Sequence, residues 1–306
     1  MIPAKILLTG ASGFLGRILS KQLVTNGSKV IGQGRKQQDI TVDISKPFSF
    51  DMGTRFDVII HAAGKAHMVP RTPEEVRAFY EVNFEGTKNL CAAIDKLPTK
   101  PKAIIFISTV AVYGKDSGEL IHEDTPLNGT TPYAKSKILA EEWLTGWAMK
   151  NNVTLCILRL PLVAGPHPPG NLGAMIKGIN TGRYLSIGTA SARKSMVWAA
   201  DIAHIVPRLI EVGGTYNLTD GYHPSFGELE KAIAGRLGKK APLKVPMAVA
   251  RGLGLVGDIL GKRAPVNSDK IQKITSTLTF NDSRAREILG WKPTKVLDNV
   301  GKMVGC

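Results

Sequence analysis

Short apolar runs alternate along the first half of the chain with longer segments whose apolar residues recur at helical spacing. The runs are almost uniformly apolar, which is typical of strands buried on both faces of a parallel sheet. The longer segments predict helices between them, and this alternation indicates an α/β fold with a doubly wound parallel sheet. The predicted strands are residues 6–8, 28–33, 40–44, 56–61, 103–107 and 153–158, and the predicted helices are residues 14–23, 73–97 and 132–147.

Three glycines stand at the first predicted strand-to-helix junction. Gly10 ends the first strand, and Gly13 and Gly16 follow at three-residue intervals. One glycine permits a tight turn, one lets the backbone approach a pyrophosphate, and one lets the helix pack closely on the strand. The helix N-terminus would present N–H groups and a partial positive charge to the phosphates. Because the triplet lies where a βαβ unit needs it, it predicts a dinucleotide site.

The regular alternation of predicted strands and helices ends after residue 160, and residues 161–170 are rich in proline and glycine. Such a run marks an irregular crossing between domains. We therefore predict a dinucleotide-binding Rossmann domain over residues 1–160, to whose sheet residues 201–220 return, and a smaller α/β substrate-binding domain over residues 161–306. The expected helices there are residues 172–180, 201–211, 225–237, 269–274 and 283–289, and the expected strands are residues 184–187 and 215–218.

The second predicted strand is followed by Arg35, with Lys36 beside it. Folds that bind NAD commonly carry an acidic residue about twenty positions beyond the glycines, where it holds the adenosine ribose. A guanidinium there would instead attract the additional 2′-phosphate of NADP. We therefore predict NADP, with NAD as the alternative, and place Asp43 near the adenine amino group.

The composition is that of an ordinary globular protein, with 43% hydrophobic and 21% charged residues. The net charge of +15 is spread over the chain and aromatic residues make up only 6%, so a nucleic-acid platform is not expected. The positive field would attract small anions such as nucleotide sugars. Cys91, Cys156 and Cys306 suggest neither a disulfide framework nor a metal site. No signal segment or membrane span is expected, and the chain is predicted to be cytoplasmic.

Residues 246–260 form an apolar segment that allows two interpretations. Basic residues follow it at Lys262 and Arg263, as in a helix that lies in a membrane interface. Its glycines, together with Arg251 and Asp258, favour a packed helix of the substrate domain or a lid. A scaffold that uses this segment at a membrane stays open as a third function.

Candidate chemistry rests on Thr109, Tyr133 and Lys137. Tyr133 and Lys137 are four residues apart on one predicted helix and share a face. Thr109 leaves the fifth strand towards the same crevice. A lysine ammonium about 4 Å from a phenol stabilises the phenolate by roughly 4 kcal/mol at an effective dielectric near 20, enough to bring its pKa from about 10 to about 7. Tyr133 could then exchange a proton while a hydride moves to or from a nicotinamide.

Several motifs together resemble the extended short-chain dehydrogenase/reductase family, and most closely its nucleotide-sugar epimerase and reductase branch. They are residues 9–16 (TGASGFLG), 61–64 (HAAG), 108–114 (STVAVYG) and 133–137 (YAKSK), with Asn83, Gly86 and Thr87, and the likeness continues to residues 281–293. The resemblance implies Thr109, Tyr133 and Lys137 as catalytic residues. The cofactor contacts that it implies are Gly10, Gly13, Phe14, Leu15, Gly16, Arg35, Asp43, Ile44, Ala62, Ala63, Gly64, Asn83, Ser108, Tyr133 and Lys137. The substrate contacts that it implies are Thr109, Asn171, Arg193 and Lys194.

The resemblance also narrows the reaction. The 4,6-dehydratases of the family carry an Asp-Glu pair after the strand-five threonine, whereas Val110 and Ala111 follow Thr109 here. Arg35 favours reduction of a UDP-4-keto sugar for surface polysaccharide synthesis over UDP-sugar 4-epimerisation, which stays the first alternative. A further alternative is a non-catalytic NADP-binding regulator. Relatives pair as homodimers through residues 73–97 and 133–150, which we expect here too.

Overall fold

A parallel sheet of seven strands forms the body of the computed structural model, which describes residues 4–66, 68–260 and 267–305. The strand order is β3-β2-β1-β4-β5-β7-β11, and every pairing is parallel. The predicted doubly wound α/β sheet is confirmed. The strands are β1 (Lys5–Thr9), β2 (Lys29–Gly34), β3 (Ile40–Thr41), β4 (Val58–His61), β5 (Ala103–Thr109), β7 (Thr154–Leu160) and β11 (Gly214–Asn217).

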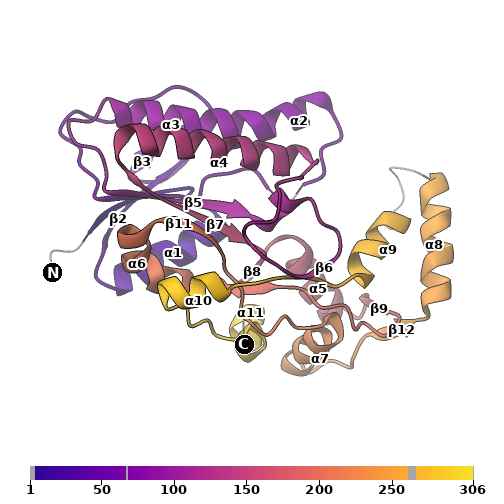
Figure 1. Cartoon of the computed structure of the whole chain (residues 1–306). Coiled ribbons are helices and arrows are strands. Elements are labelled where there is room, and N and C mark those ends of the chain that lie inside the picture. Colours follow the sequence, from indigo (N-terminus) through magenta and orange to yellow (C-terminus); the bar gives the residue numbers. More distant parts are fainter. Residues whose placement is uncertain (1–3, 67, 261–266, 306) are drawn as a thin grey trace.

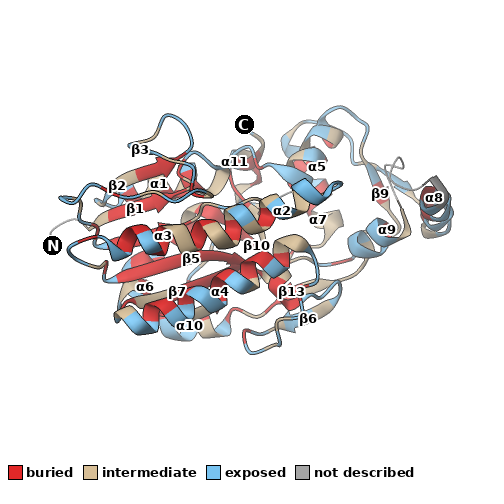
Figure 2. Cartoon of the chain, turned by 90° about the horizontal axis from the view of Figure 1, so that it is seen from above, coloured by how far each residue is buried: buried red, intermediate tan, exposed pale blue. Residues whose placement is uncertain are grey.

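Helices cover both faces of this sheet (Figure 1). On one face lie α2 (Pro73–Tyr80), the π-helical turn η1 (Glu81–Glu85), α3 (Gly86–Asp95) and α4 (Pro132–Asn151). On the other face lie α1 (Phe14–Thr25), the 3₁₀ segment η3 (Ala199–Ile205), α6 (Val206–Val212) and α10 (Ser283–Leu289). The central strands β1, β4, β5 and β7 are therefore buried almost throughout (Figure 2), and this burial is the reason for their largely apolar sequences.

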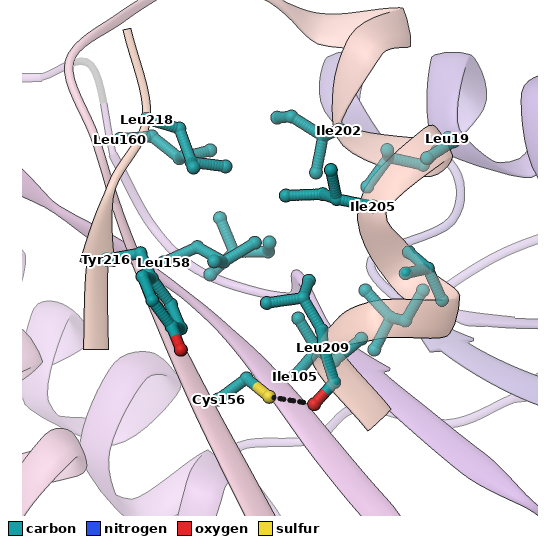
Figure 3. Close-up of a cluster of buried hydrophobic side chains, with 14 of the residues drawn as sticks. Leu19, Ile105, Cys156, Leu158, Leu160, Ile202, Ile205, Leu209, Tyr216 and Leu218 are labelled. Atoms are coloured by element: carbon teal, nitrogen blue, oxygen red, sulfur yellow. Dashed lines mark hydrogen bonds between the residues drawn. The ribbon is translucent and has the colours of Figure 1, made fainter. Parts of the chain in front are cut away.

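The return of the chain to the sheet after residue 200 is visible in the second of these layers. Figure 3 shows Ile202, Ile205 and Leu209 of η3 and α6 facing Leu158 and Tyr216 of β7 and β11. In the same layer the thiol of Cys156 donates to the Leu209 carbonyl oxygen over 2.9 Å. The α10 helix adds Ala285 and Leu289, so residues from the predicted second domain complete the core of the first. The domain boundaries themselves stay a prediction.

The remaining elements form a smaller layer beside the carboxyl ends of the strands (Figure 1). Three two-stranded parallel pairs, β8–β10, β9–β12 and β6–β13, hold it together, and most of these strands were not predicted. Ser225 and Glu228 form a capping box at the start of α7, within the helix predicted over residues 225–237. The elements are η2 (Val110–Tyr113), β6 (Gly118–Ile121), β8 (Leu162–Ala164), α5 (Gly170–Asn180), β9 (Leu185–Ile187), β10 (Met196–Trp198), α7 (Phe226–Arg236), β12 (Leu243–Val245), α8 (Met247–Leu260), α9 (Ser268–Thr275), β13 (Leu278–Phe280), η5 (Val296–Asn299) and α11 (Val300–Val304).

Candidate active site

The turn between β1 and α1 is built around backbone positions that only glycine fills. Gly10 has φ of +70°, and a Cβ atom there would lie 2.7 Å from the Ala63 nitrogen. A Cβ atom on Gly16 would lie 2.1 Å from the Gly10 carbonyl oxygen, so this glycine lets the helix approach the turn. Gly13 donates its N–H to the same oxygen over 2.9 Å. It is the N-cap residue of α1, and no side chain caps this helix. The turn and close-packing roles predicted for two of the glycines are confirmed.

A cleft of about 280 Å³ opens in front of this turn, at the carboxyl ends of β1, β2 and β4. It lies where the strand order reverses, which is the position at which open α/β sheets bind ligands. No acidic residue stands in the first turn of α1, so the positive end of the helix dipole is not neutralised there. We call this the strand-end cleft. Its lining residues are Gly10, Ser12, Gly13, Gln33, Gly34, Arg35, Val42, Asp43, Ile44, Ser45, Ala62, Ala63, Gly64, Lys65 and Val82.

Eight of the predicted cofactor contacts thus share one cleft, and the others do not line it. Leu15 packs against the apolar layer under α1, and Phe14 lies against the Cβ position of Gly165. Residues that sequence reasoning missed include Ser12, Gln33 and Lys65. Ser12 lies inside the glycine motif and Lys65 directly follows residues 61–64, so their sequence positions were a usable signal.

Polar groups inside the strand-end cleft fit a nucleotide. Gln33 donates Nε2–H to the Val42 carbonyl oxygen over 2.9 Å, while its Oε1 is buried and has no hydrogen-bond partner among the residues that the structure describes. An unsatisfied buried acceptor costs about 1–3 kcal/mol, which a ligand N–H donor would offset. Hydrogen bonds from Ser45, and then the charges of Arg35 and Lys46, lower the pKa of Asp43, which keeps this carboxylate ionised. The cleft therefore offers acceptors beside Arg35 and the glycine turn.

A hydrogen-bonded relay fixes the edge of this cleft. The Thr87 hydroxyl donates to the Asn83 carbonyl oxygen over 2.6 Å, so its oxygen accepts from His61 Nε2 at 2.9 Å. His61 Nδ1 is then an acceptor for the Thr9 hydroxyl at 2.7 Å, and the Thr9 oxygen accepts the Ala63 N–H. Burial, and secondly the charge of Lys137, lowers the pKa of His61 to about 3, so the imidazole stays neutral. The relay ties β1 to β4 and α3 and is structural.

Asn83 holds the loop that follows β4. Its Oδ1 accepts the Lys65 N–H at 2.7 Å, and its Nδ2 donates to the Lys65 carbonyl oxygen and to Ser136 Oγ at 3.1 and 2.9 Å. Both amide hydrogens are therefore used. Asn83 lies in the π-helical turn η1, an irregularity frequent at functional sites. The structure gives Asn83 a positioning role, and its predicted contact with the cofactor stays a prediction.

Lys137 reaches from α4 to the end of β5. Its Nζ donates to the Ile107 carbonyl oxygen over 2.7 Å and lies 4.4 Å from the centroid of the Phe106 ring. A Cβ atom on Gly64 would lie 3.5 Å from the same nitrogen, so the ammonium is beside the strand-end cleft. Burial lowers the pKa of Lys137 to about 8, against the opposing charge of Glu141.

Tyr133 joins Thr109 at the end of the same strand. Burial raises the pKa of Tyr133 above its ordinary value, and the neighbouring Thr109 side chain offsets only part of this rise. The expectation that Lys137 alone brings the phenol near pH 7 is wrong for this structure. The reason is that burial penalises the phenolate, while Lys137 itself is desolvated and donates to a backbone carbonyl.

Ser108 does not line the strand-end cleft. Its hydroxyl donates a short hydrogen bond to Glu141, whose carboxylate also accepts from Arg159 at 2.7 Å. Arg159 in turn donates to the hydroxyl of Tyr113 at 3.2 Å and to the Glu123 carbonyl oxygen at 2.9 Å. This buried ionic network braces β5, β7 and α4, and the predicted cofactor contact of Ser108 stays a prediction. Sequence reasoning missed this network.

The predicted substrate residues Asn171, Arg193 and Lys194 do not line the strand-end cleft. Asn171 is exposed in the first turn of α5. Arg193 donates to the carbonyl oxygens of Tyr222 and His223, and Lys194 donates to that of Lys273 at 2.9 Å. Burial lowers the pKa of Lys194. Their contacts with a diphosphate stay predictions.

The two cysteines that the structure describes carry no reactive signature. Cys91 and Cys156 are free and buried, and burial raises the pKa of each thiol to about 12. Cys306 lies outside the described residues. Within the described ranges no group of histidine, cysteine and acidic side chains could hold a metal ion, and no helix is long and apolar enough to cross a membrane.

A glycine turn under a parallel sheet, with a tyrosine and a lysine at the end of β5, defines a nicotinamide-dependent short-chain dehydrogenase/reductase site. Residues 6–219 match the model of the NAD dependent epimerase/dehydratase family, and the chain belongs to this family of enzymes. The chain is 30% identical over 298 residues to N-acetyl-α-D-glucosaminyl-diphospho-ditrans,octacis-undecaprenol 4-epimerase of Escherichia coli O157:H7, covering 91% of this chain and 88% of the relative. It is 27% identical to UDP-glucose 4-epimerase of Vibrio cholerae, covering 97% and 93%.

Solved structures agree with the fold. RMD from Pseudomonas aeruginosa complexed with NADPH superposes with a TM-score of 0.75 at 20% identity, covering 99% of this chain and 98% of that one. UDP-glucose 4-epimerase from Thermotoga maritima gives a TM-score of 0.75 at 19% identity, covering 98% and 97%.

Proposed function

We propose that the chain interconverts epimers at C4 of a hexose carried on a diphosphate. The observation that carries the proposal is the position of Tyr133 beside Thr109 at the end of β5, with Lys137 one helical turn further along α4 and next to the strand-end cleft. A sugar hydroxyl in place of the Thr109 partner would put its proton within reach of the phenol. The two relatives named above act at the same sugar carbon, which supports this reaction over others of the family.

In this scheme the residues of the chain handle the proton. Tyr133 accepts the proton of the C4 hydroxyl when the sugar is oxidised and returns it when the sugar is reduced. Thr109 holds the reacting oxygen, and the Lys137 ammonium stabilises the phenolate. When bound, the nicotinamide supplies the hydride acceptor and, in its oxidised form, a positive charge. Because burial raises the pKa of Tyr133, the phenol is a proton carrier at neutral pH only while positive charge lies near it.

The proposed cofactor position uses the glycine turn for the pyrophosphate and the Gln33 and Asp43 oxygens for the adenine side. Arg35 is exposed at the mouth of the strand-end cleft, where it would meet a 2′-phosphate. This favours NADP over NAD. A preference for NADP would suit net reduction of a UDP-4-keto sugar, which we keep as the second candidate reaction.

The carrier of the sugar is either UDP or a lipid diphosphate. The Vibrio relative is named for a UDP-sugar and the Escherichia relative for an undecaprenyl diphosphate sugar. Both present a diphosphate to a basic chain whose net charge is +15. We also propose a role in surface polysaccharide synthesis, with which either carrier is compatible.

The test compares products with and without consumption of cofactor. The purified enzyme is incubated with UDP-N-acetylglucosamine or UDP-glucose together with NADP⁺ or NAD⁺, or with a UDP-4-keto-6-deoxy sugar together with NADPH. The sugars are resolved by chromatography while the absorbance of the reduced cofactor is followed. Epimers without net NADPH oxidation support the proposal, whereas oxidation with the keto sugar alone replaces it by the reductase.

The Tyr133→Phe variant separates catalysis from cofactor binding. We expect turnover to fall about 10²- to 10⁴-fold while NADPH affinity stays nearly unchanged. Tyr80→Phe, which removes a phenol hydroxyl from α2, is the control. Should Tyr133→Phe keep full turnover, the proposed chemistry is wrong; a wild type that binds NADPH but turns over no substrate would favour the regulator.

We further propose a homodimer formed through α4. Leu139 and Trp143 lie one turn apart on this helix and are 36% and 42% exposed. An apolar pair at this spacing on a surface helix is suited to a partner helix. Sedimentation of wild type and Trp143→Glu tests the assembly, because a dimer formed through this face is lost in the variant.

A further inference from the structure

Helix α8 buries three small residues on one face and leaves large apolar residues exposed on the other. Ala250, Gly254 and Gly257 are buried, whereas Val249, Leu255 and Val256 are 53%, 62% and 53% exposed. A helix that packs in a protein core shows the reverse order. The predicted packing of this helix is therefore met only on the face formed by Ala250, Gly254 and Gly257, which we call the glycine face. The outward face of α8 is unpartnered (Figure 2).

The glycine face is fixed, so the helix cannot roll its apolar side into the protein. A Cβ atom on Gly254 would lie 2.8 Å from Ile271 Cδ1 and 3.2 Å from the Ser268 backbone of α9. Asp258 Oδ1 also accepts the Ser268 N–H over 3.1 Å. The α8 and α9 helices thus form a hairpin that stands at the side of the molecule away from β2 and β3 (Figure 1). Exposure of the large residues follows from this packing.

The sequence around α8 is strongly basic. Lys239, Lys240 and Lys244 precede it and are exposed, and Arg251 is exposed on its flank. Asp258 and Asp269 are the acidic residues of the segment 239–273, and Asp269 is paired with Lys273 at 3.1 Å. Lys262 and Arg263, which also belong to this segment of the sequence, lie outside the described residues. Charge and apolar surface therefore occur on the same part of the chain.

These two features together select the partner. A second copy of this chain would bring its own lysines against these, which charge repulsion opposes. An anionic bilayer satisfies both features, because lysines attract its headgroups while apolar side chains enter the headgroup and acyl boundary. The helix is 14 residues long, about 21 Å, which suits a helix lying in the interface and not one crossing it.

We infer that the outward face of α8, formed by Val249, Leu255 and Val256, docks the protein on an anionic membrane surface. The inference goes beyond the proposed function and does not depend on it. Docking would bring the enzyme to sugars whose diphosphate is carried by a lipid, and it would equally stand if the carrier were UDP.

The test is vesicle flotation of the full-length chain. Wild type is mixed with vesicles of phosphatidylglycerol and phosphatidylcholine, or of phosphatidylcholine alone, at low and high salt. We expect flotation with the anionic vesicles only, weakened by salt. The double variant Val249→Glu/Leu255→Glu is expected to lower the bound fraction about tenfold or more. Val24→Glu/Met52→Glu is the matched control, because both residues are exposed, at 56% and 68%, and the charge change is the same.

A second variant, Lys239→Gln/Lys240→Gln/Lys244→Gln, tests the contribution of the lysines. It should reduce binding to anionic vesicles while its circular dichroism spectrum stays unchanged. Equal flotation of wild type and the α8 variant overturns the inference, as does equal binding to both kinds of vesicle. A wild type that self-associates without floating, and that becomes monomeric in the α8 variant alone, assigns this face to a second copy and also overturns it. Failure of flotation leaves the sugar-epimerase proposal standing, because that assay needs no membrane.

Discussion

Replacing Lys137 by methionine should remove a rise in stability that the wild type shows at alkaline pH. The buried ammonium of Lys137 has its pKa lowered from 10.5 to about 8 by desolvation. Below pH 8 both the folded and the unfolded chain carry the charge, and the folded chain bears the full cost of burying it. Between pH 8 and 10.5 the folded chain releases its proton first, so stability increases with pH through this window.

The size of the effect follows from the shift. A difference of about 2.5 pKa units corresponds to about 3 kcal/mol, of which about 2 kcal/mol should be regained between pH 7 and pH 9.5. Methionine has a similar length and no charge, so the variant lacks this linkage. At neutral pH the variant gains free energy of unfolding because it buries no charge. It loses about 1–3 kcal/mol because the hydrogen bond to the Ile107 carbonyl oxygen is absent.

Urea unfolding of the cofactor-free protein at several pH values between 7 and 9.5 measures the difference. Lys135→Met is the control, because Lys135 is exposed on the same helix and its loss should leave the pH dependence of wild type intact. A Lys137→Met variant whose stability rises with pH as steeply as that of wild type would refute the reasoning. Turnover should also be lost, since the phenolate of Tyr133 would have no ammonium beside it.

Three further outcomes are expected. His61, whose pKa falls from 6.5 to about 3 on burial, should make wild type lose about 2 kcal/mol between pH 7 and pH 5, and His61→Gln should flatten this dependence in urea titrations. Gly16→Ala should destabilise the fold by about 1–3 kcal/mol because its Cβ atom would meet the Gly10 carbonyl oxygen, whereas Gly235→Ala, in open space on α7, should stabilise it by about 0.5–1 kcal/mol; equal signs in thermal unfolding would contradict the packing. Arg35→Ala should weaken NADPH binding about tenfold or more and leave NADH binding unchanged in fluorescence titrations, and equal losses would remove its role in cofactor choice.

Local signals were sufficient for the main sheet and the glycine turn. An apolar run such as 103–107 can be satisfied only between two covering layers, and Gly10, Gly13 and Gly16 constrain the backbone whatever surrounds them. The direction of Ser108 could have been predicted as well. Side chains alternate along a strand, so Ser108 shares a face with Phe106, which lies under α4.

Other features had no local signal. The three-residue strands β8, β10 and β12 exist because distant segments supply their hydrogen-bond partners. The segment 246–260 contains small and large apolar residues that hydropathy treats alike, so only its packing on α9 shows which of them face outwards.

The sequence by itself determined the alternation of strands and helices in the main sheet, the glycine turn and the types of residue at the end of β5, because short-range geometry and residue chemistry dictate them. Tertiary structure alone decided the electrostatics of Tyr133, the bracing of Ser108 by Glu141 and the exposure of α8. The physical reason is that a pKa and an exposed face depend on desolvation and on neighbours from remote parts of the chain, neither of which spacing along the sequence contains.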